Sequence, residues 1–247
     1  MATNIIFLHH STGGVIWNGG VADWFTAYNT AHETDYQITE ANYPDTGGGY
    51  PWANYPYDYW NLWVNHTEDY LGEHHLDYWC TNYDVIVFKF CFPVTGMDEN
   101  STPDITSDVK SDENYRLQLA AVKTVLLANP TKKFLVWTGA AQRIEDTYEA
   151  AATRARTFFQ PGGWFQTVFD QVGDNIFVWD FRTLETDGGL YLTPAHASTD
   201  SHPNSTFAAE VAPLFCQRLV DVIEGIGDGV TVHRSIGRAG RKVVVAG

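Results

Sequence analysis

Five short apolar runs, each separated from the next by a longer segment, constrain the fold of this chain more than any other feature. They cover residues 4–8, 36–41, 83–90, 133–139 and 175–180. Runs of this length and composition are typical of buried strands. Helical spacing of apolar residues covers 114–127, 144–159 and 164–172, and a closing helix is expected over 205–226.

Strands that alternate with helices and are apolar on both faces indicate a parallel sheet covered on both sides. The sequence therefore predicts an α/β fold, a three-layer α/β/α sandwich of the flavodoxin-like kind with a five-stranded parallel sheet. The 247 residues are enough for one large domain. We expect it to span residues 1–226, because no linker or internal repeat divides them.

The end of the chain, residues 227–247, differs in composition from the rest. It carries four basic residues and many glycines and valines, and no acidic residue follows Asp228. This basic tail is compatible with a disordered end, a partner-binding arm or a terminal hairpin.

Composition argues against several classes of protein. The net charge of −15, from 30 acidic and 15 basic residues, disfavours nucleic acid or an anionic membrane as the main partner. No apolar stretch approaches the ~20 residues of a membrane span. No secretory signal is visible, so the default expectation is a cytoplasmic protein. The three cysteines, Cys80, Cys91 and Cys216, are widely spaced and form no CxxC pair, which argues against a disulfide framework.

Aromatic residues are unusually frequent, at 15% with nine tryptophans, and they crowd residues 50–79. One interpretation is that these rings pack over the core as a lid, and another is a stacking platform for a sugar or another flat ligand. Residues 60–71 are a candidate helix. Residues 50–59 contain Pro51 and Pro56 and are predicted not to be helical.

The first apolar run ends abruptly in His9-His10-Ser11-Thr12-Gly13. The small residues allow a sharp turn that leaves Ser11 at the carboxyl end of the strand, the edge of an open α/β sheet at which ligands bind. Ser11 is therefore a candidate nucleophile. The alternative is an ordinary turn residue or a helix N-cap.

A serine hydroxyl needs a base to take its proton, and the base works best when a third group orients it. The loop before the last helix reads Thr199-Asp200-Ser201-His202-Pro203-Asn204. His202 is the candidate base, and Asp200 is close enough in sequence to orient its imidazole. A structural, hydrogen-bonded histidine is the alternative interpretation of His202.

A serine in a small-residue turn after the first strand, together with an aspartate and His-Pro-Asn before the last helix, resembles the SGNH or GDSL hydrolase superfamily. The resemblance implies a five-stranded α/β/α sandwich that hydrolyses esters of acylated sugars, lipids and small molecules without a cofactor or metal. It places Ser11 as nucleophile and His202 as base. With the aromatic content, it favours deacetylation of a small-molecule or carbohydrate ester.

The chain departs from the superfamily pattern at three places. His9-His10-Ser11 replaces the usual Gly-Asp-Ser, and the position three residues before the histidine is Thr199 rather than an acid. Asp200 or Asp180 must then complete the triad. The asparagine expected after the third strand has no counterpart, because Phe90-Cys91-Phe92-Pro93 occupies that place.

The oxyanion hole must therefore come from other donors. The candidates are the Ser11 backbone with Gly13, glycines 47–49 (Gly47 and Gly48 above all), Cys91 and His10. Two rival functions remain open at this point. One is a non-catalytic carbohydrate- or ligand-binding module whose oxyanion hole has decayed. The other is a metal-dependent hydrolase that uses His9 or His10 with His196, Asp200 and His202.

Overall fold

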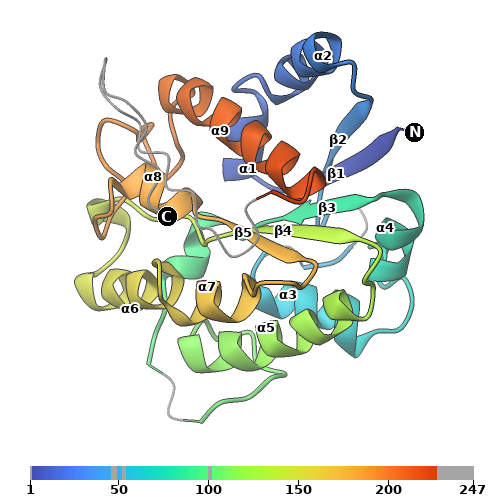
Figure 1. Cartoon of the computed structure of the whole chain (residues 1–247). Helices are drawn as coiled ribbons and strands as arrows, with labels where there is room; N and C mark the ends of the chain where they lie inside the picture. Colours follow the sequence, from blue (N-terminus) through green and yellow to red (C-terminus); the bar gives the residue numbers. More distant parts are fainter. Residues whose placement is uncertain (1, 46–48, 52–53, 100–101, 227–247) are drawn as a thin grey trace.

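The computed structural model describes residues 2–45, 49–51, 54–99 and 102–226. Its centre is a five-stranded sheet in which all neighbours are parallel, in the order β2-β1-β3-β4-β5 (Figure 1). The strands are β1 (Thr3–His9), β2 (Tyr36–Asn42), β3 (Val85–Phe88), β4 (Lys133–Trp137) and β5 (Ile176–Trp179). The predicted five-stranded parallel α/β fold is confirmed, and each strand lies within one or two residues of its predicted position.

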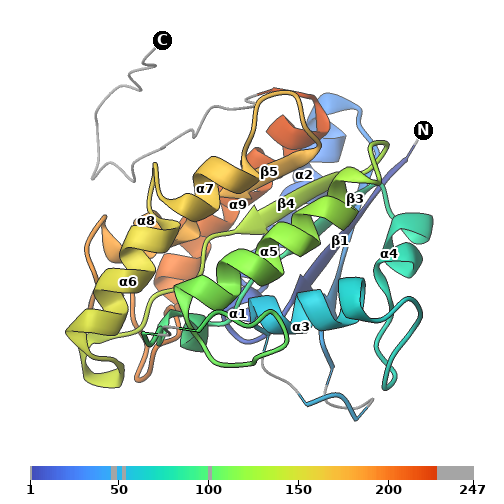
Figure 2. The same ribbon diagram turned by 90° about the horizontal axis from the view of Figure 1, so that it is seen from below.

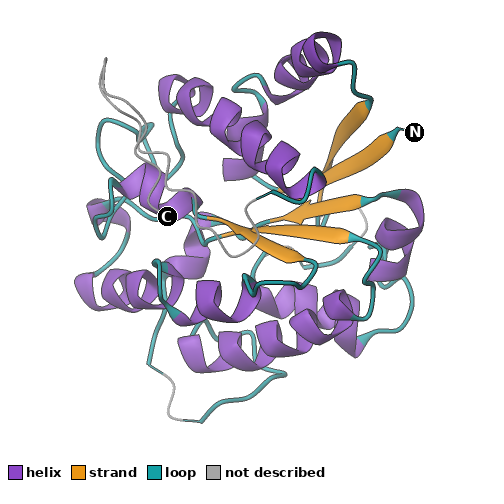
Figure 3. Ribbon diagram, viewed as in Figure 1, coloured by secondary structure: helices purple, strands orange, loops and turns teal. Residues whose placement is uncertain are grey.

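Helices cover both faces of the sheet, as Figures 2 and 3 show. One face carries α1 (Thr12–Trp17), α2 (Val21–His32) and α9 (Ser205–Ile223). The other carries α3 (Pro56–Trp60), α4 (Leu76–Asn82), α5 (Asp112–Leu127), α6 (Glu149–Phe159) and α7 (Trp164–Phe169). A short helix, α8 (Phe181–Thr186), follows β5 directly. None of these described helices is long and apolar enough to cross a membrane.

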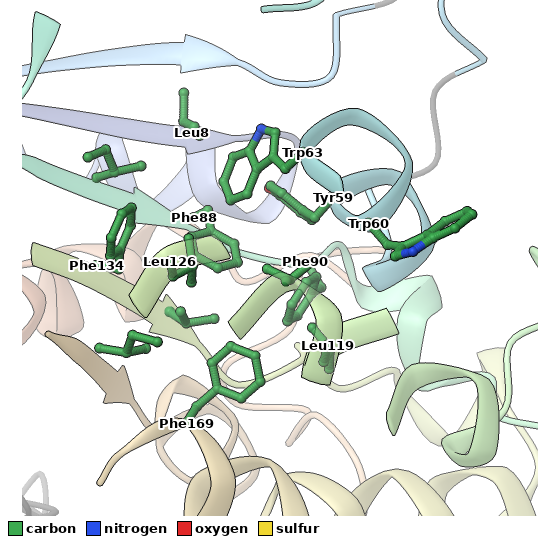
Figure 4. Packing of buried hydrophobic residues seen from close by; sticks show 14 of the residues in the cluster. Leu8, Tyr59, Trp60, Trp63, Phe88, Phe90, Leu119, Leu126, Phe134 and Phe169 are labelled. Carbon is green, nitrogen blue, oxygen red and sulfur yellow. The ribbon is translucent and has the colours of Figure 1, made fainter. Parts of the chain in front are cut away.

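Each face has its own apolar core, and the core beneath α3 and α5 is rich in rings (Figure 4). Tyr59 packs with ring centroids 4.9 Å from Trp63 and 4.8 Å from Phe88. Trp60 and Trp79 belong to the same buried cluster. Most of the described aromatic residues of the segment 50–79 therefore belong to the core, as the packing interpretation expects. Cys80, Cys91 and Cys216 are buried free thiols.

The prediction that residues 50–59 contain no helix was wrong. α3 begins at Pro56, the first helical position, where the missing N–H of proline costs no intrahelical bond. Asp58 then accepts a hydrogen bond from the Tyr55 N–H at 2.7 Å, which closes the first turn. The helix continues only as a π-helical turn, Asn61–Asn65, and not to residue 71.

Other helices differ from the prediction in their extent. The segment predicted as one helix over 144–159 is a short 3-10 turn, Ile144–Asp146, followed by α6. Three short helices, α1, α4 and α8, were not predicted. The basic tail of residues 227–247 lies outside the described residues, and its three alternatives stay as predicted.

The junction of β1 and α1 is packed so closely that it admits no side chain at Gly13. A β-carbon at Gly13 would lie 2.4 Å from Cβ and 2.7 Å from Cγ of His9, distances that real β-carbons do not reach. At the neighbouring Gly14, a β-carbon would lie 3.5 Å from Cε1 and 3.9 Å from Nδ1 of His9, which are ordinary contacts. A side chain is therefore excluded at Gly13 but has room at Gly14.

We expect Gly13→Ala to lower the free energy of unfolding by about 1–3 kcal/mol, because α1 must move away from His9. Gly14→Ala is the matched control, since it adds the same methyl group to the same helix. It should leave stability unchanged or raise it by up to about 1 kcal/mol through helix propensity. Urea denaturation of both variants measures the difference, and equal effects would contradict the packing argument.

Candidate active site

Those predicted site residues that the structure describes gather at the carboxyl edge of the sheet, beside the neighbouring strands β1 and β3. The chain leaves β1 toward β2 on one side and later returns to β3 on the other, so this is the point at which strand order reverses. Ligands in open α/β sheets bind in the crevice at such a point. Ser11 follows β1, a 3-10 turn (Phe92–Thr95) follows β3, and His202 lies on the loop that leads into α9.

Ser11 has a backbone conformation that L-residues rarely adopt, with φ of 48° and ψ of −103°. Such a conformation costs on the order of 1–3 kcal/mol and is concentrated at functional sites. Ser11 occupies the N-cap position of α1, but its side chain makes no capping hydrogen bond. Its Oγ instead contacts Nε2 of His202, 191 positions further along the chain. The side chain therefore does not act as the helix cap that the alternative interpretation expects.

The imidazole of His202 lies between Ser11 and Asp200. Its Nδ1 is 2.9 Å from Oδ1 of Asp200. An ionised carboxylate only accepts hydrogen bonds, so Nδ1 carries the proton and the Nε2 lone pair faces the Ser11 hydroxyl. The ring of Phe92, from the turn after β3, stands edge-on to the imidazole at 5.1 Å. Serine, histidine and aspartate thus form one continuous chain of hydrogen bonds.

Asp200 is held ionised by its immediate neighbours. The Ser198 hydroxyl donates to Oδ1 at 2.7 Å, and the His202 backbone N–H donates to the same oxygen at 3.0 Å. The Ser198 hydrogen bond, with the contacts to His202, lowers the pKa of Asp200 to about 2. The carboxylate is more than half exposed, so solvent also favours its charge.

Asp180, the other acid considered for this role, lies at the start of α8. It accepts hydrogen bonds from the hydroxyl of Thr183 at 2.6 Å and from that of Thr138 at 3.2 Å. It also accepts from the Thr183 backbone N–H and so caps the helix. Asp200 is therefore the acid for which the structure shows a contact with the imidazole.

Several candidate oxyanion donors already have other partners. The Gly13 N–H donates to the carbonyl of His10 at 2.8 Å, and the Cys91 N–H donates to the carbonyl of Asn54 at 3.1 Å. The His10 ring binds the carbonyl of Pro44 through Nε2. For the Ser11 N–H, no acceptor is found within the described part of the chain. Gly47 and Gly48 lie outside the described residues.

Asn54 lies close to the place at which the superfamily asparagine is missing, since its carbonyl binds Cys91. Its side-chain amide, however, donates to the carbonyl of Tyr43 at 3.0 Å and to the hydroxyl of Tyr59 at 3.1 Å. In this arrangement the amide supports the loop and does not face an open site.

Lys89 is a residue of this region that sequence reasoning missed. It follows β3 with only 1% of its surface exposed. Its Nζ donates to the carbonyl of His10 at 3.0 Å and contacts Sγ of Cys91 at 3.4 Å. Burial lowers its pKa. The visible signal was a lysine inside an otherwise apolar run, because a buried charge needs a specific partner.

His9 has a structural place beneath α1. Its ring is buried, and Nε2 contacts Oε2 of Glu40 at 2.7 Å. Burial, followed by the positive charge of Lys89, lowers the pKa of His9 to about 3. At neutral pH this contact is a hydrogen bond from a neutral imidazole and not an ion pair.

The geometry does not support the metal-site alternative. His196 stacks on Phe207 at 4.2 Å and places Nδ1 3.0 Å from the carbonyl of Glu185. Across the described ranges, no three histidine, cysteine, aspartate or glutamate side chains come together as a metal-binding group. Asp200 and His202 contact each other, while His9, His10 and His196 have other partners.

Glu185 of α8 is a fully buried acid behind this edge. Its side chain accepts from the Ala141 N–H, while Oε2 has no hydrogen-bond partner among the described residues. Burial raises its pKa to about 8. Its carbonyl accepts from the Thr193 N–H at 3.2 Å and contacts His196, so α8 supports the loop that carries His202.

Comparison with known proteins supports the fold and leaves the family open. No protein-family profile matches the chain, and no curated protein sequence matches it. A crystal structure from Bacteroides fragilis NCTC 9343, described as a putative acylhydrolase, is similar with a TM-score of 0.51 and 13% identity. The match covers 89% of this chain and 86% of that one. The similarity shows an α/β fold shared across most of both chains.

The raised pKa of Glu185 makes stability depend on pH. The folded protein holds this proton up to about pH 8, whereas an exposed glutamate releases it near 4.5, so stability should fall as pH rises between those values. We expect Glu185→Gln to remove that part of the decline. The exposed Glu149→Gln is the matched control and should keep the decline of the parent. Denaturation at several pH values measures both, and an unchanged profile in Glu185→Gln contradicts the assignment.

Proposed function

We propose that this chain is a serine hydrolase of the SGNH type that cleaves carboxylic esters. The observation that carries the proposal is the continuous chain of contacts from Ser11 through His202 to Asp200. These are three residues of the right chemistry, in the right order, at the ligand-binding edge of the sheet. The similarity to a structure described as a putative acylhydrolase agrees with ester cleavage.

In the proposed reaction, Oγ of Ser11 attacks the ester carbonyl while Nε2 of His202 takes its proton. Asp200 keeps the proton on Nδ1 and stabilises the imidazolium that forms. His202 then protonates the leaving alcohol, and the acyl group remains on Ser11. Water, deprotonated by His202, attacks the acyl-serine and releases the acid.

The negative charge that develops on the carbonyl oxygen needs at least two donors. The Ser11 N–H is the first candidate, since it has no acceptor in the described structure. Gly47 or Gly48 is the second by resemblance. Lys89 adds a positive charge under the same turn, where it supports the carbonyl of His10.

The substrate class proposed is a small-molecule ester, with acetylated carbohydrate among its members. The carbohydrate component rests on the ring content of residues 50–79. The burial of Tyr59, Trp60 and Trp63 in the core reduces the number of rings free to stack on a sugar. Short acyl esters are therefore the first substrates to test.

A binding module on the same fold is the second candidate, and a specific observation favours it. The Cys91 N–H and the Asn54 amide, which lie near the missing asparagine, are both engaged by protein groups. Each lost oxyanion donor typically costs ~10²–10³ in rate. Turnover by the parent protein decides between the two candidates.

Hydrolysis of p-nitrophenyl acetate and labelling by a fluorophosphonate test the proposal. We expect Ser11→Ala to abolish labelling and His202→Ala to lower kcat/KM by at least about 10³, since each removes a reacting group. Ser205→Ala, an exposed serine on the first turn of α9, is the control and should behave as the parent. If the parent protein shows neither serine-dependent labelling nor turnover of any short ester, the hydrolase proposal is wrong. The binding module is then the favoured function.

The role of Asp200 is tested separately from that of the nucleophile. We expect Asp200→Asn to lower kcat by about 10²–10⁴, because the amide no longer holds the imidazole in the productive tautomer. Ser198→Ala should cost less, about tenfold, since it removes one of several hydrogen bonds to the carboxylate. Steady-state kinetics with p-nitrophenyl acetate compares the two. A larger loss in Ser198→Ala than in Asp200→Asn would contradict the assignment.

A further inference from the structure

A pocket whose lining includes neither Ser11 nor His202 lies between the end of α6 and α8. The pocket between them has a volume of about 280 Å³. It is lined by Arg156 and Gln160 from α6 and its end, by Arg182 and Thr186 from α8, and by Gly188 beyond α8.

Arg182 is the unusual member of this lining. Only 2% of its surface is exposed, yet its guanidinium has few partners. Nη2 donates to the carbonyl of Leu190 at 2.9 Å. Nε and Nη1 are buried and have no hydrogen-bond acceptor among the described residues. A buried charged group with unmet donors is costly, on the order of several kcal/mol, unless an acceptor is supplied.

The nearby acids do not supply that acceptor. Glu185 is largely protonated at neutral pH, because burial raises its pKa to about 8. Asp180 directs its carboxylate oxygens to Thr183 and Thr138. Burial lowers the pKa of Arg182 to about 10, so its guanidinium is still charged at pH 7.

A second positively charged residue, Arg156, lines the same pocket and is exposed. Burial is the main cause of the lowered pKa of Arg182, and the charge of Arg156 lowers it slightly further against the opposite effect of Glu185 and Asp180. Two like charges are thus held near one cavity in a protein whose net charge is −15. An anion between the two guanidinium groups would offset their mutual repulsion.

We infer that the pocket between α6 and α8 binds a phosphate-type oxyanion, in the form of a phosphate monoester. A guanidinium offers paired N–H donors that match the oxygens of phosphate, and two arginines match the charge of a phosphate group, about −1.5 to −2 at pH 7. The cavity is larger than the ion alone and leaves room for a small organic group. Gln160 is a further polar group at its wall, whereas the Thr186 hydroxyl already donates to the carbonyl of Arg182 at 2.7 Å.

Isothermal titration of the full chain with inorganic phosphate and with phenyl phosphate tests this site, at constant ionic strength set by sodium chloride. We expect saturable binding at one site per chain, with phenyl phosphate at least as tight as inorganic phosphate. Acetate at the same concentrations should bind at least about tenfold more weakly. No saturable binding of either phosphate compound overturns the proposal, and equal affinity for acetate overturns the choice of anion.

The variant Arg156→Gln tests the pocket at an exposed residue, where a substitution is expected to disturb the fold little. We expect it to raise the Kd for phosphate at least about tenfold, the effect of losing one charged hydrogen bond. Arg154→Gln is the matched control, since Arg154 lies on the same helix, carries the same charge and pairs with Glu99 instead. It should change the Kd less than twofold. If the two variants raise the Kd equally, phosphate binding depends on the overall charge of the protein and not on this pocket, and the proposal is wrong.

A second variant, Arg182→Met, tests the buried charge directly. We expect it to abolish phosphate binding while circular dichroism shows a folded protein, since methionine fills similar volume without an unmet donor. If Arg182→Met does not fold, Arg156→Gln and its control still decide the question. Phosphate binding that survives in folded Arg182→Met contradicts the proposal. Neither variant touches Ser11 or His202, so the outcome is independent of ester hydrolysis.

Discussion

The tight turn from β1 into α1 is the constraint on which the carboxyl edge of this protein depends. Gly13 must be a glycine because α1 lies directly against His9, and Lys89 holds the turn from the β3 side through the carbonyl of His10. With the chain held at both ends, Ser11 takes a positive φ and its hydroxyl faces outward to His202. The strained backbone of Ser11 thus directs its side chain toward His202.

Ionisable side chains are buried along this edge to a degree that an ordinary core avoids. Lys89, Arg182 and Glu185 are each at least 98% buried, and each would cost several kcal/mol without partners. Departures from the rules of burial are expected where a protein has a function to serve. At Lys89 the partners are present within the chain. At Arg182 two donors have none in the described structure, which separates this region from the serine site.

Much of the architecture could be predicted from local pattern, because a strand buried on both faces must be apolar throughout. Errors arose where one residue type has two uses. Pro56 was taken to exclude a helix, although proline is favoured at the first helical position. Lys89 was included in a strand that ends at Phe88, where its side chain turns to serve the neighbouring loop. The aromatic residues of the segment 50–79 have the composition of a ligand-stacking surface. Most of those that the structure describes are nevertheless buried in the core.

The sequence by itself determined the sheet, the strand ends at which polar residues follow apolar runs, and the chemical types of Ser11 and His202. Those features are local, since periodicity and turn residues act over a few positions. Only the tertiary structure decided that Asp200 contacts the imidazole while Asp180 caps α8, and that the N–H groups of Gly13 and Cys91 already have acceptors. The physical reason is that each hydrogen-bonding group has few partners, and which partner is within 3 Å depends on how distant segments pack.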